Sequence, residues 1–169
     1  MNYENGEKVC LWDRVNLGGE DKGIVVISVD DDQYSSRFPK EQWSYLQRGV
    51  MIDTTFGGLV HFPEKDEDLE LIVRGDTPSP QEWAILRKVQ LETGKSEWKS
   101  GKGESVQIGY VNRNGQICTG HRETPGNDHL QRAYRVECGR CGHVYGANGS
   151  DMHGRCCPEC QSGAPGIAY

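Results

Sequence analysis

The sequence lacks the segments and motifs that define common classes of membrane protein and enzyme. No stretch approaches the ~20 consecutive apolar residues of a membrane-spanning helix, and the polar start, residues 1–8, does not resemble an export signal. A Gly-x-Ser-x-Gly motif, a phosphate-binding P-loop and a dinucleotide-binding glycine pattern are all missing. These absences predict a cytoplasmic protein with no membrane partner, outside the best-known hydrolase, kinase and dehydrogenase classes.

Basic residues are scarce in the first half of the chain. Residues 1–75 contain eight Lys and Arg against fifteen Asp and Glu, whereas residues 76–169 contain eleven against ten. Because affinity for nucleic-acid phosphates comes mostly from basic side chains, any contact with DNA or RNA is expected in the second half. After Lys102 every basic residue is an arginine, which suits both phosphates and the carboxylates of a protein partner. The candidate nucleic-acid-binding residues are Arg113, Arg132, Arg135, Arg140 and Arg155.

Cysteine is concentrated near the C-terminal end. Cys138 and Cys141 form one Cys-x-x-Cys pair, and Cys157 and Cys160 form a second after fifteen intervening residues. Each pair brings two thiolates to one side of a tight turn, and two such turns supply four tetrahedral ligands for one ion. Four thiolates favour zinc over other divalent metals. The sequence therefore predicts one structural zinc ion bound by these four cysteines.

The two pairs, within residues 135–166, resemble the zinc-ribbon class. This resemblance implies a small metal-stabilised domain, and zinc ribbons often bind nucleic acid. An alternative is a disulfide framework, which would need an export signal, and a redox role for a single pair is another. The third ligand stays open, because Cys156 and Cys160 form a looser version of the same turn as Cys157 and Cys160. Cys10 and Cys118 lie in apolar stretches and are expected to pack in the interior.

The first 75 residues alternate short apolar runs with turn residues. The pattern predicts five strands near residues 8–12, 23–30, 49–54, 56–62 and 69–74, and a short helix over 39–47. In strand pattern this region resembles small barrels of the Tudor and KOW type, so an acidic five-stranded β-barrel is expected over residues 1–75. Some Tudor-like domains bind methylated side chains through aromatic rings. The candidate aromatic ligand site is Trp12, Tyr34, Trp43 and Phe56, with core packing as the alternative for these rings.

A helix and a polar connector are predicted between the two domains, over residues 76–104. Ser79 and Glu82 form a capping box with Pro80 at the first helical position, and Gly94 marks the helix end. The zinc-ribbon domain follows over residues 105–169. Within it the pattern predicts a hairpin over residues 106–119 and a strand over 130–137, and the glycine-rich segment 145–151 is expected to be a loop. The fold class expected is mainly β with short helices.

The candidate residues favour binding over catalysis. Four thiolates saturate a zinc ion and leave no open position for substrate. Nucleases of the His-Asn-His type also frame a hairpin with cysteine pairs, but the required histidine and asparagine spacing is missing between these pairs. Two hypotheses remain. The chain is a nucleic-acid-associated accessory or regulatory factor, or it is a protein–protein adaptor or inhibitor whose acidic first half occupies a basic surface of its partner.

Overall fold

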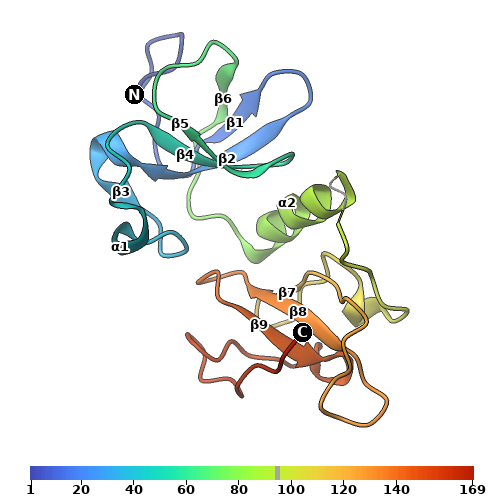
Figure 1. The fold of residues 1–169 in the computed structure, drawn as a ribbon. Helices are drawn as coiled ribbons and strands as arrows, with labels where there is room; N and C mark the ends of the chain where they lie inside the picture. Colours follow the sequence, from blue (N-terminus) through green and yellow to red (C-terminus); the bar gives the residue numbers. More distant parts are fainter. Residues whose placement is uncertain (94–95) are drawn as a thin grey trace. The chain divides into compact units, whose positions relative to one another are not determined.

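The computed structural model describes residues 1–93 and 96–169, which divide into two compact units. Unit 1 spans Met1–Pro78 and unit 2 spans Ser79–Tyr169 (Figure 1). The chain as a whole is mainly β with two short helices, so the expected fold class is confirmed at this level. No helix in the described ranges has the length and apolar character needed to cross a lipid bilayer.

Unit 1 is built on an antiparallel sheet in the order β5-β4-β2-β1-β6, with the short β3 paired to β2. Strands β5 and β6 are the two ends of this order, so the sheet is open and the expected five-stranded barrel is not confirmed. The strands are β1 (Arg14–Leu17), β2 (Lys22–Ser28), β3 (Gln33–Tyr34), β4 (Val50–Thr54), β5 (Gly58–Phe62) and β6 (Leu69–Val73). Between them lie a 3-10 turn, η1 (Val29–Asp31), and one helical turn, α1 (Lys40–Trp43).

The core of unit 1 comes from aliphatic side chains on the central strands. Every residue of β4 is buried, because β4 pairs with β2 on one side and with β5 on the other. Ile52 on β4 fits so closely against β2 that a Cβ on Gly23 would lie 2.4 Å from its Cγ2 atom. The buried cluster is Tyr3, Val9, Val15, Val25, Val50, Ile52 and Leu69.

The first strand of unit 1 is not the one that the sequence predicts. Residues 8–12 lead into a turn, and β1 begins only at Arg14. Within this turn Trp12 adopts a left-handed φ of 71°, which a strand does not permit. The buried Asp13 carboxylate holds the turn, since it accepts hydrogen bonds from the Tyr3 hydroxyl at 2.7 Å and from the Cys10 N–H at 2.8 Å.

Unit 2 combines one longer helix with a three-stranded antiparallel sheet in the order β7-β8-β9. Its core consists of Val106, Cys118, Tyr134, Val136, Tyr145, Ala147 and Met152. The elements are α2 (Pro80–Thr93), η2 (Glu104–Val106), β7 (Gln116–Cys118), β8 (Ala133–Cys138), β9 (Val144–Asn148) and η3 (Gly149–Asp151).

Helix α2 begins at the predicted capping box. The Glu82 N–H donates to the Ser79 hydroxyl oxygen at 3.2 Å, and the Ser79 N–H donates to the Glu82 carboxylate at 2.8 Å. The Trp83 side chain just inside the helix is fully buried, which fixes this end of α2 in unit 2. Gly94, the predicted helix end, and Lys95 of the predicted connector lie outside the described residues.

Two further predictions for unit 2 are wrong. Residues 106–111 do not form a strand: η2 ends at Val106, and only Val111 bridges Ile117. The glycine-rich segment 145–151 begins as strand β9 and not as a loop. Gly146 is needed there because the C-terminal segment passes against it, and a Cβ would lie 2.2 Å from the Ile167 carbonyl oxygen.

Candidate metal centre

The first cysteine turn begins where strand β8 ends. Cys138 is the last residue of β8, and its N–H donates to the His143 carbonyl oxygen at 2.9 Å. The Gly142 N–H donates back to the Cys138 carbonyl oxygen at 2.9 Å, closing a tight turn around Cys141. Gly142 has φ of 78°, a left-handed conformation that glycine adopts without strain. Strand β8 therefore positions Cys138, and the turn that follows the strand positions Cys141.

The second cysteine turn is closed by its own backbone. The Cys157 carbonyl oxygen accepts hydrogen bonds from the Gln161 N–H at 3.1 Å and from the Gly163 N–H at 2.9 Å. The chain packs tightly here, since a Cβ on Gly163 would lie 2.0 Å from the Cys156 carbonyl oxygen. These contacts fold residues 157–163 back over the first turn's thiols without a regular strand or helix.

The four sulfur atoms form one compact group. Cys138 Sγ lies 3.7 Å from Cys160 Sγ, Cys141 Sγ lies 3.7 Å from Cys157 Sγ, and all four ligand atoms lie within 4.8 Å of one another. A tetrahedron with metal–sulfur bonds of about 2.3 Å has edges of about 3.8 Å. A disulfide would need a sulfur–sulfur distance of about 2.05 Å, and all seven cysteines are free thiols. The four cysteines are arranged to bind one metal ion.

Comparison with known proteins finds no match to this chain. No family model matches the chain, and neither a curated protein nor a solved structure matches it. The zinc-ribbon resemblance therefore depends on the cysteine group alone. Cys157, and not Cys156, belongs to this group. The Cys156 thiol instead lies 3.9 Å from the Gly154 carbonyl oxygen, as a weak donor.

The environment of the thiols favours one thiolate before any metal binds. Burial raises the pKa of Cys138, but the backbone N–H groups of Cys141 and Arg140 outweigh it and lower that pKa to about 7. Burial and hydrogen bonding to the neighbouring thiols raise the pKa of Cys160. Burial likewise raises the pKa of Cys141. Of these three thiols, Cys138 is therefore the one that loses its proton most easily to a metal.

A buried glutamine lies beside the first turn, and the sequence analysis missed it. Gln116 on β7 is fully buried, and its Nε2 donates to Cys138 Sγ at 3.6 Å and to Gln161 Oε1 at 2.8 Å. Its Oε1 accepts a hydrogen bond from the Tyr145 hydroxyl at 3.0 Å. Gln161 in turn accepts from the Cys157 N–H at 2.9 Å. Two amide side chains thus connect one cysteine of each pair.

Asn112 extends this network to the loop before the second turn. Its Nδ2 donates to the carbonyl oxygens of Met152 and Arg155, both at 2.8 Å. Its Oδ1 accepts from the N–H groups of Asn114 at 2.9 Å and Gln116 at 3.0 Å. The run of amides at 112, 114 and 116 was the available sequence signal, but only the fold shows that the first two bond to the loop before the second turn and the third to Cys138.

The five candidate arginines differ in what they contact. Arg132 lies 3.1 Å from the Glu123 carboxylate, and Arg135 donates to the Thr119 hydroxyl at 2.8 Å. Arg155 donates to two backbone carbonyl oxygens of the C-terminal segment. Arg113 and Arg140 are exposed, and neither side chain has a hydrogen-bond or ion-pair partner within residues 1–93 and 96–169.

The two unpartnered arginines lie on adjoining turns. Arg113 belongs to the turn closed by the Gly115 N–H and the Asn112 carbonyl oxygen at 3.0 Å, and Arg140 lies between the first two cysteines. The Gly139 N–H donates to the Gly115 carbonyl oxygen at 2.9 Å, which joins the two turns. Two free guanidinium groups therefore project from neighbouring backbone beside the metal centre.

The candidate aromatic residues of unit 1 make varied contacts. The Trp43 ring packs on Phe38 at 6.2 Å and on Tyr45 at 6.0 Å between ring centroids. Tyr34 faces the Lys40 ammonium at 5.8 Å. Trp12 lies in the turn before β1, and Phe56 is half exposed in the turn between β4 and β5. An aromatic ligand site at these four residues stays a prediction.

Proposed function

We propose that the metal is a single zinc ion and that unit 2 is a non-catalytic zinc ribbon. The donor set supports this proposal, because four sulfur ligands at tetrahedral spacing match a closed structural zinc site. A zinc ion bound there would cross-link the two cysteine turns. Cys138, Cys141, Cys157 and Cys160 would hold it, while Gln116 and Gln161 would orient the sulfurs and the backbone around them.

We further propose that the protein is a nucleic-acid-associated accessory factor that contacts phosphates through Arg113 and Arg140. The observation that carries this proposal is that these two exposed guanidinium groups, on turns joined at Gly139 and Gly115, have no partner in the described ranges. Arg132 has an acidic partner, and Arg135 and Arg155 donate to other groups within unit 2. An arginine guanidinium group can bind a phosphate through two parallel N–H···O hydrogen bonds.

Salt-dependent binding tests this function. The zinc-loaded protein would be titrated with single-stranded and duplex DNA and RNA at several salt concentrations. The Arg113→Ala/Arg140→Ala variant should bind more weakly, and its salt slope should fall by about 2, because about one unit of slope is lost per phosphate contact. An Arg48→Ala/Lys88→Ala variant removes the same charge from other exposed positions and should keep the slope. An unchanged slope in the first variant would refute the assignment.

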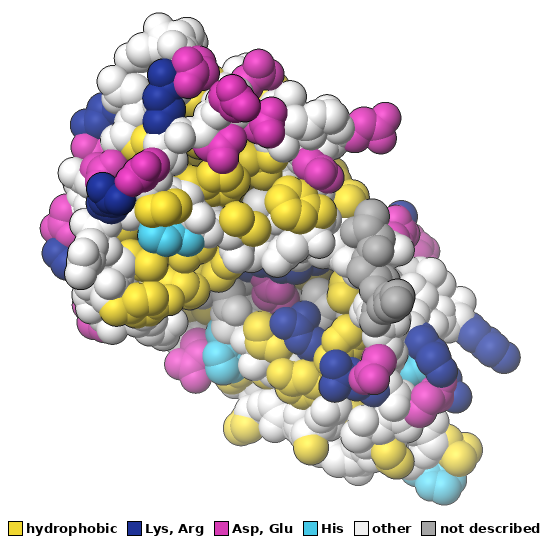
Figure 2. All heavy atoms as spheres, turned by 45° about the horizontal axis from the view of Figure 1, so that its top comes forward, with side chains coloured by type: hydrophobic (Ala, Val, Ile, Leu, Met, Phe, Trp, Pro, Cys, Tyr) yellow, Lys and Arg dark blue, Asp and Glu magenta, His cyan; other side chains and the backbone are white. Residues whose placement is uncertain are grey.

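A protein–protein adaptor or inhibitor is the second candidate function, and the charge of unit 1 favours it. Asp and Glu side chains gather over unit 1 on the face shown in Figure 2. Residues 1–75 alone contain fifteen of them against eight Lys and Arg. Such a surface would attract a basic protein partner and repel nucleic acid. Failure of the zinc-loaded protein to bind any nucleic acid at low salt would make this the leading function.

A further inference from the structure

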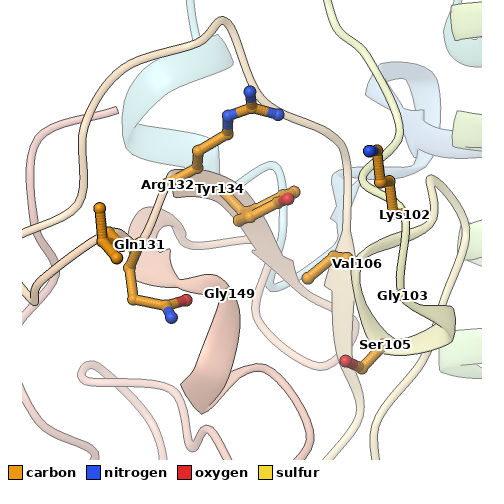
Figure 3. A pocket seen from close by; sticks show the side chains of 9 residues that line it. Lys102, Gly103, Ser105, Val106, Gln131, Arg132, Tyr134 and Gly149 are labelled. Carbon is orange, nitrogen blue, oxygen red and sulfur yellow. The ribbon is translucent and has the colours of Figure 1, made fainter.

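Unit 2 contains an open cavity that is distinct from the metal centre. Its volume is about 430 Å³, and three chain segments line it: 102–106 around η2, 130–134 leading into β8, and Gly149 at the start of η3 (Figure 3). Pockets for small organic ligands typically measure roughly 300–1,000 Å³. No cysteine of the metal centre, and neither Arg113 nor Arg140, lines the cavity. It therefore needs an explanation of its own.

A buried tyrosine leaves its hydroxyl group unpartnered in this cavity. The Tyr134 side chain is only 6% exposed, and its hydroxyl has no hydrogen-bond partner in the described part of the chain. Figure 3 shows this side chain extending from β8 into the space between Arg132 and Lys102. Gly101 leaves room for it, since a Cβ there would lie 2.3 Å from the hydroxyl oxygen. Solvent reaches the hydroxyl through the open cavity, so a ligand oxygen in the cavity can accept a hydrogen bond from it.

Two cationic side chains, Lys102 and Arg132, line the cavity. The Lys102 ammonium has no ion-pair partner within residues 1–93 and 96–169, and no Asp or Glu lines the cavity. One Nη atom of Arg132 lies 3.1 Å from a carboxylate oxygen of Glu123, and both side chains are about half exposed. Exposed pairs of this kind are weak, and the guanidinium keeps further N–H groups for a ligand. Two cations and one hydroxyl donor thus surround the same space.

These donors match a phosphomonoester better than a carboxylate. A phosphomonoester carries a charge of about −1.5 to −2 at neutral pH and three acceptor oxygens. It therefore offers one acceptor oxygen to each of the three donors, Lys102, Arg132 and the Tyr134 hydroxyl, whereas a carboxylate has only two oxygens. Apolar surface lies beside the donors. Val106 lines the cavity and Leu130, 89% exposed with φ of 59°, holds a large apolar side chain at its edge.

We infer that this cavity binds the phosphomonoester group of a nucleotide. The phosphate is held by Lys102, Arg132 and the Tyr134 hydroxyl, and the base packs against Val106 and Leu130. The same chemistry has two sources, a free mononucleotide and the 5′-phosphate at the end of a nucleic-acid strand. The inference does not depend on the phosphate contacts proposed for Arg113 and Arg140, because the two sets share no residue.

Isothermal titration of the zinc-loaded full chain tests the cavity. The probes are adenosine 5′-monophosphate, adenosine, and a six-nucleotide single strand with either a 5′-phosphate or a 5′-hydroxyl. Adenosine 5′-monophosphate or the 5′-phosphorylated strand should bind, and the matching probe without the phosphate should bind at least about tenfold more weakly, since charged hydrogen bonds are lost. Binding of the mononucleotide alone identifies a free nucleotide as ligand, and binding of the strand alone identifies a strand end.

Three variants link binding to the cavity. Lys102→Ala should weaken phosphate-dependent binding about tenfold or more, and Tyr134→Phe, which removes only the hydroxyl, should weaken it about three- to tenfold. Lys88→Ala removes an exposed lysine outside the cavity and should change nothing. Circular dichroism and zinc content would verify that Tyr134→Phe is folded.

Three results would overturn the inference: no binding of either phosphorylated probe, equal binding of the phosphate-free probes, or unchanged binding by both Lys102→Ala and Tyr134→Phe. The Arg113→Ala/Arg140→Ala variant should still bind adenosine 5′-monophosphate or the strand's 5′-phosphate group. The failure of one proposal is thereby distinguished from the failure of the other.

Discussion

Unit 1 and unit 2 fill their interiors by different means. Unit 1 buries a cluster of aliphatic side chains between strands that pair along most of their length. Unit 2 also has an apolar cluster, but fully buried amides and histidine, such as Gln116 and His121, occupy part of its interior. Its second cysteine turn has no regular strand or helix. Unit 1 therefore depends on apolar burial, whereas the metal ion proposed for unit 2 would add a cross-link between its two cysteine turns.

The largest expected effect is the loss of the metal. Cys138→Ser or Cys160→Ser should unfold most of unit 2 and leave unit 1 folded, because structural zinc contributes about 10–16 kcal/mol to small zinc domains. Hydrogen exchange measured along the chain would show which unit unfolds, and zinc content would show whether the metal is lost. Cys156→Ser is the matched control and should keep the metal, since Cys156 is outside the group of four. Full zinc content in both ligand variants would refute the ligand set.

The converse experiment destabilises unit 1 through a substitution in its core. Ile52 is fully buried on β4, between β5 and β2, and Ile52→Ala should lower the free energy of unfolding of unit 1 by about 2–5 kcal/mol. Unit 2 should retain its zinc. Ile72→Ala on β6 is the control, because Ile72 is 51% exposed and its loss should change stability by no more than about 0.5 kcal/mol. If Ile52→Ala released the zinc, the two units would not be independent in stability.

The parts of the fold that the sequence predicts are those set by neighbouring residues. Apolar runs locate β2, β4, β5 and β6, and Ser79 with Glu82 locates the start of α2. The four cysteines are predicted because two thiols three residues apart already share a turn. In each case the signal and the structure lie within a few residues of each other.

The wrong predictions depend on residues distant in sequence. The run 8–12 looks like a strand, yet Asp13 closes a turn there because Arg74, sixty-one residues further along the chain, donates to its carboxylate at 2.7 Å. Gly146 looks like a loop residue until Ile167 passes against it. Barrel closure would likewise need pairing between the end strands β5 and β6, which strand pattern alone does not specify.

Replacing Gln116 tests whether the amide network beside the cysteines affects zinc affinity. Gln116→Ala removes the donor to Cys138 Sγ and the link to Gln161, and it should weaken zinc affinity about 10- to 100-fold, as the loss of groups around metal ligands commonly does. Competition with a chromogenic chelator would measure this affinity. Gln42→Ala, an exposed glutamine in unit 1, is the control. Equal affinity in the two variants would mean that the amide network does not position the ligands.

The smallest expected effect is a dependence of unit 1 on pH. A hydrogen bond from Lys8 lowers the pKa of Asp31 against the opposing effect of burial, and the Ser28 hydroxyl, at 2.9 Å, lowers it further. A carboxyl group whose pKa is lower in the folded state stabilises the fold above its unfolded pKa of about 3.9, and this contribution disappears as the pH falls through the folded value. Unit 1 should therefore lose a little stability as the pH falls below about 5.

Urea unfolding of unit 1 at several pH values measures this contribution. Asp31→Asn should be less stable near neutral pH and should lose less stability in acid than the native protein, whereas Asp32→Asn should follow the native curve more closely. Asp32 is the suitable control because its side chain is 68% exposed, against 16% for Asp31, so water weakens its pairing with Lys40. Parallel curves for Asp31→Asn and the native protein would show that the Lys8 pair does not stabilise the fold.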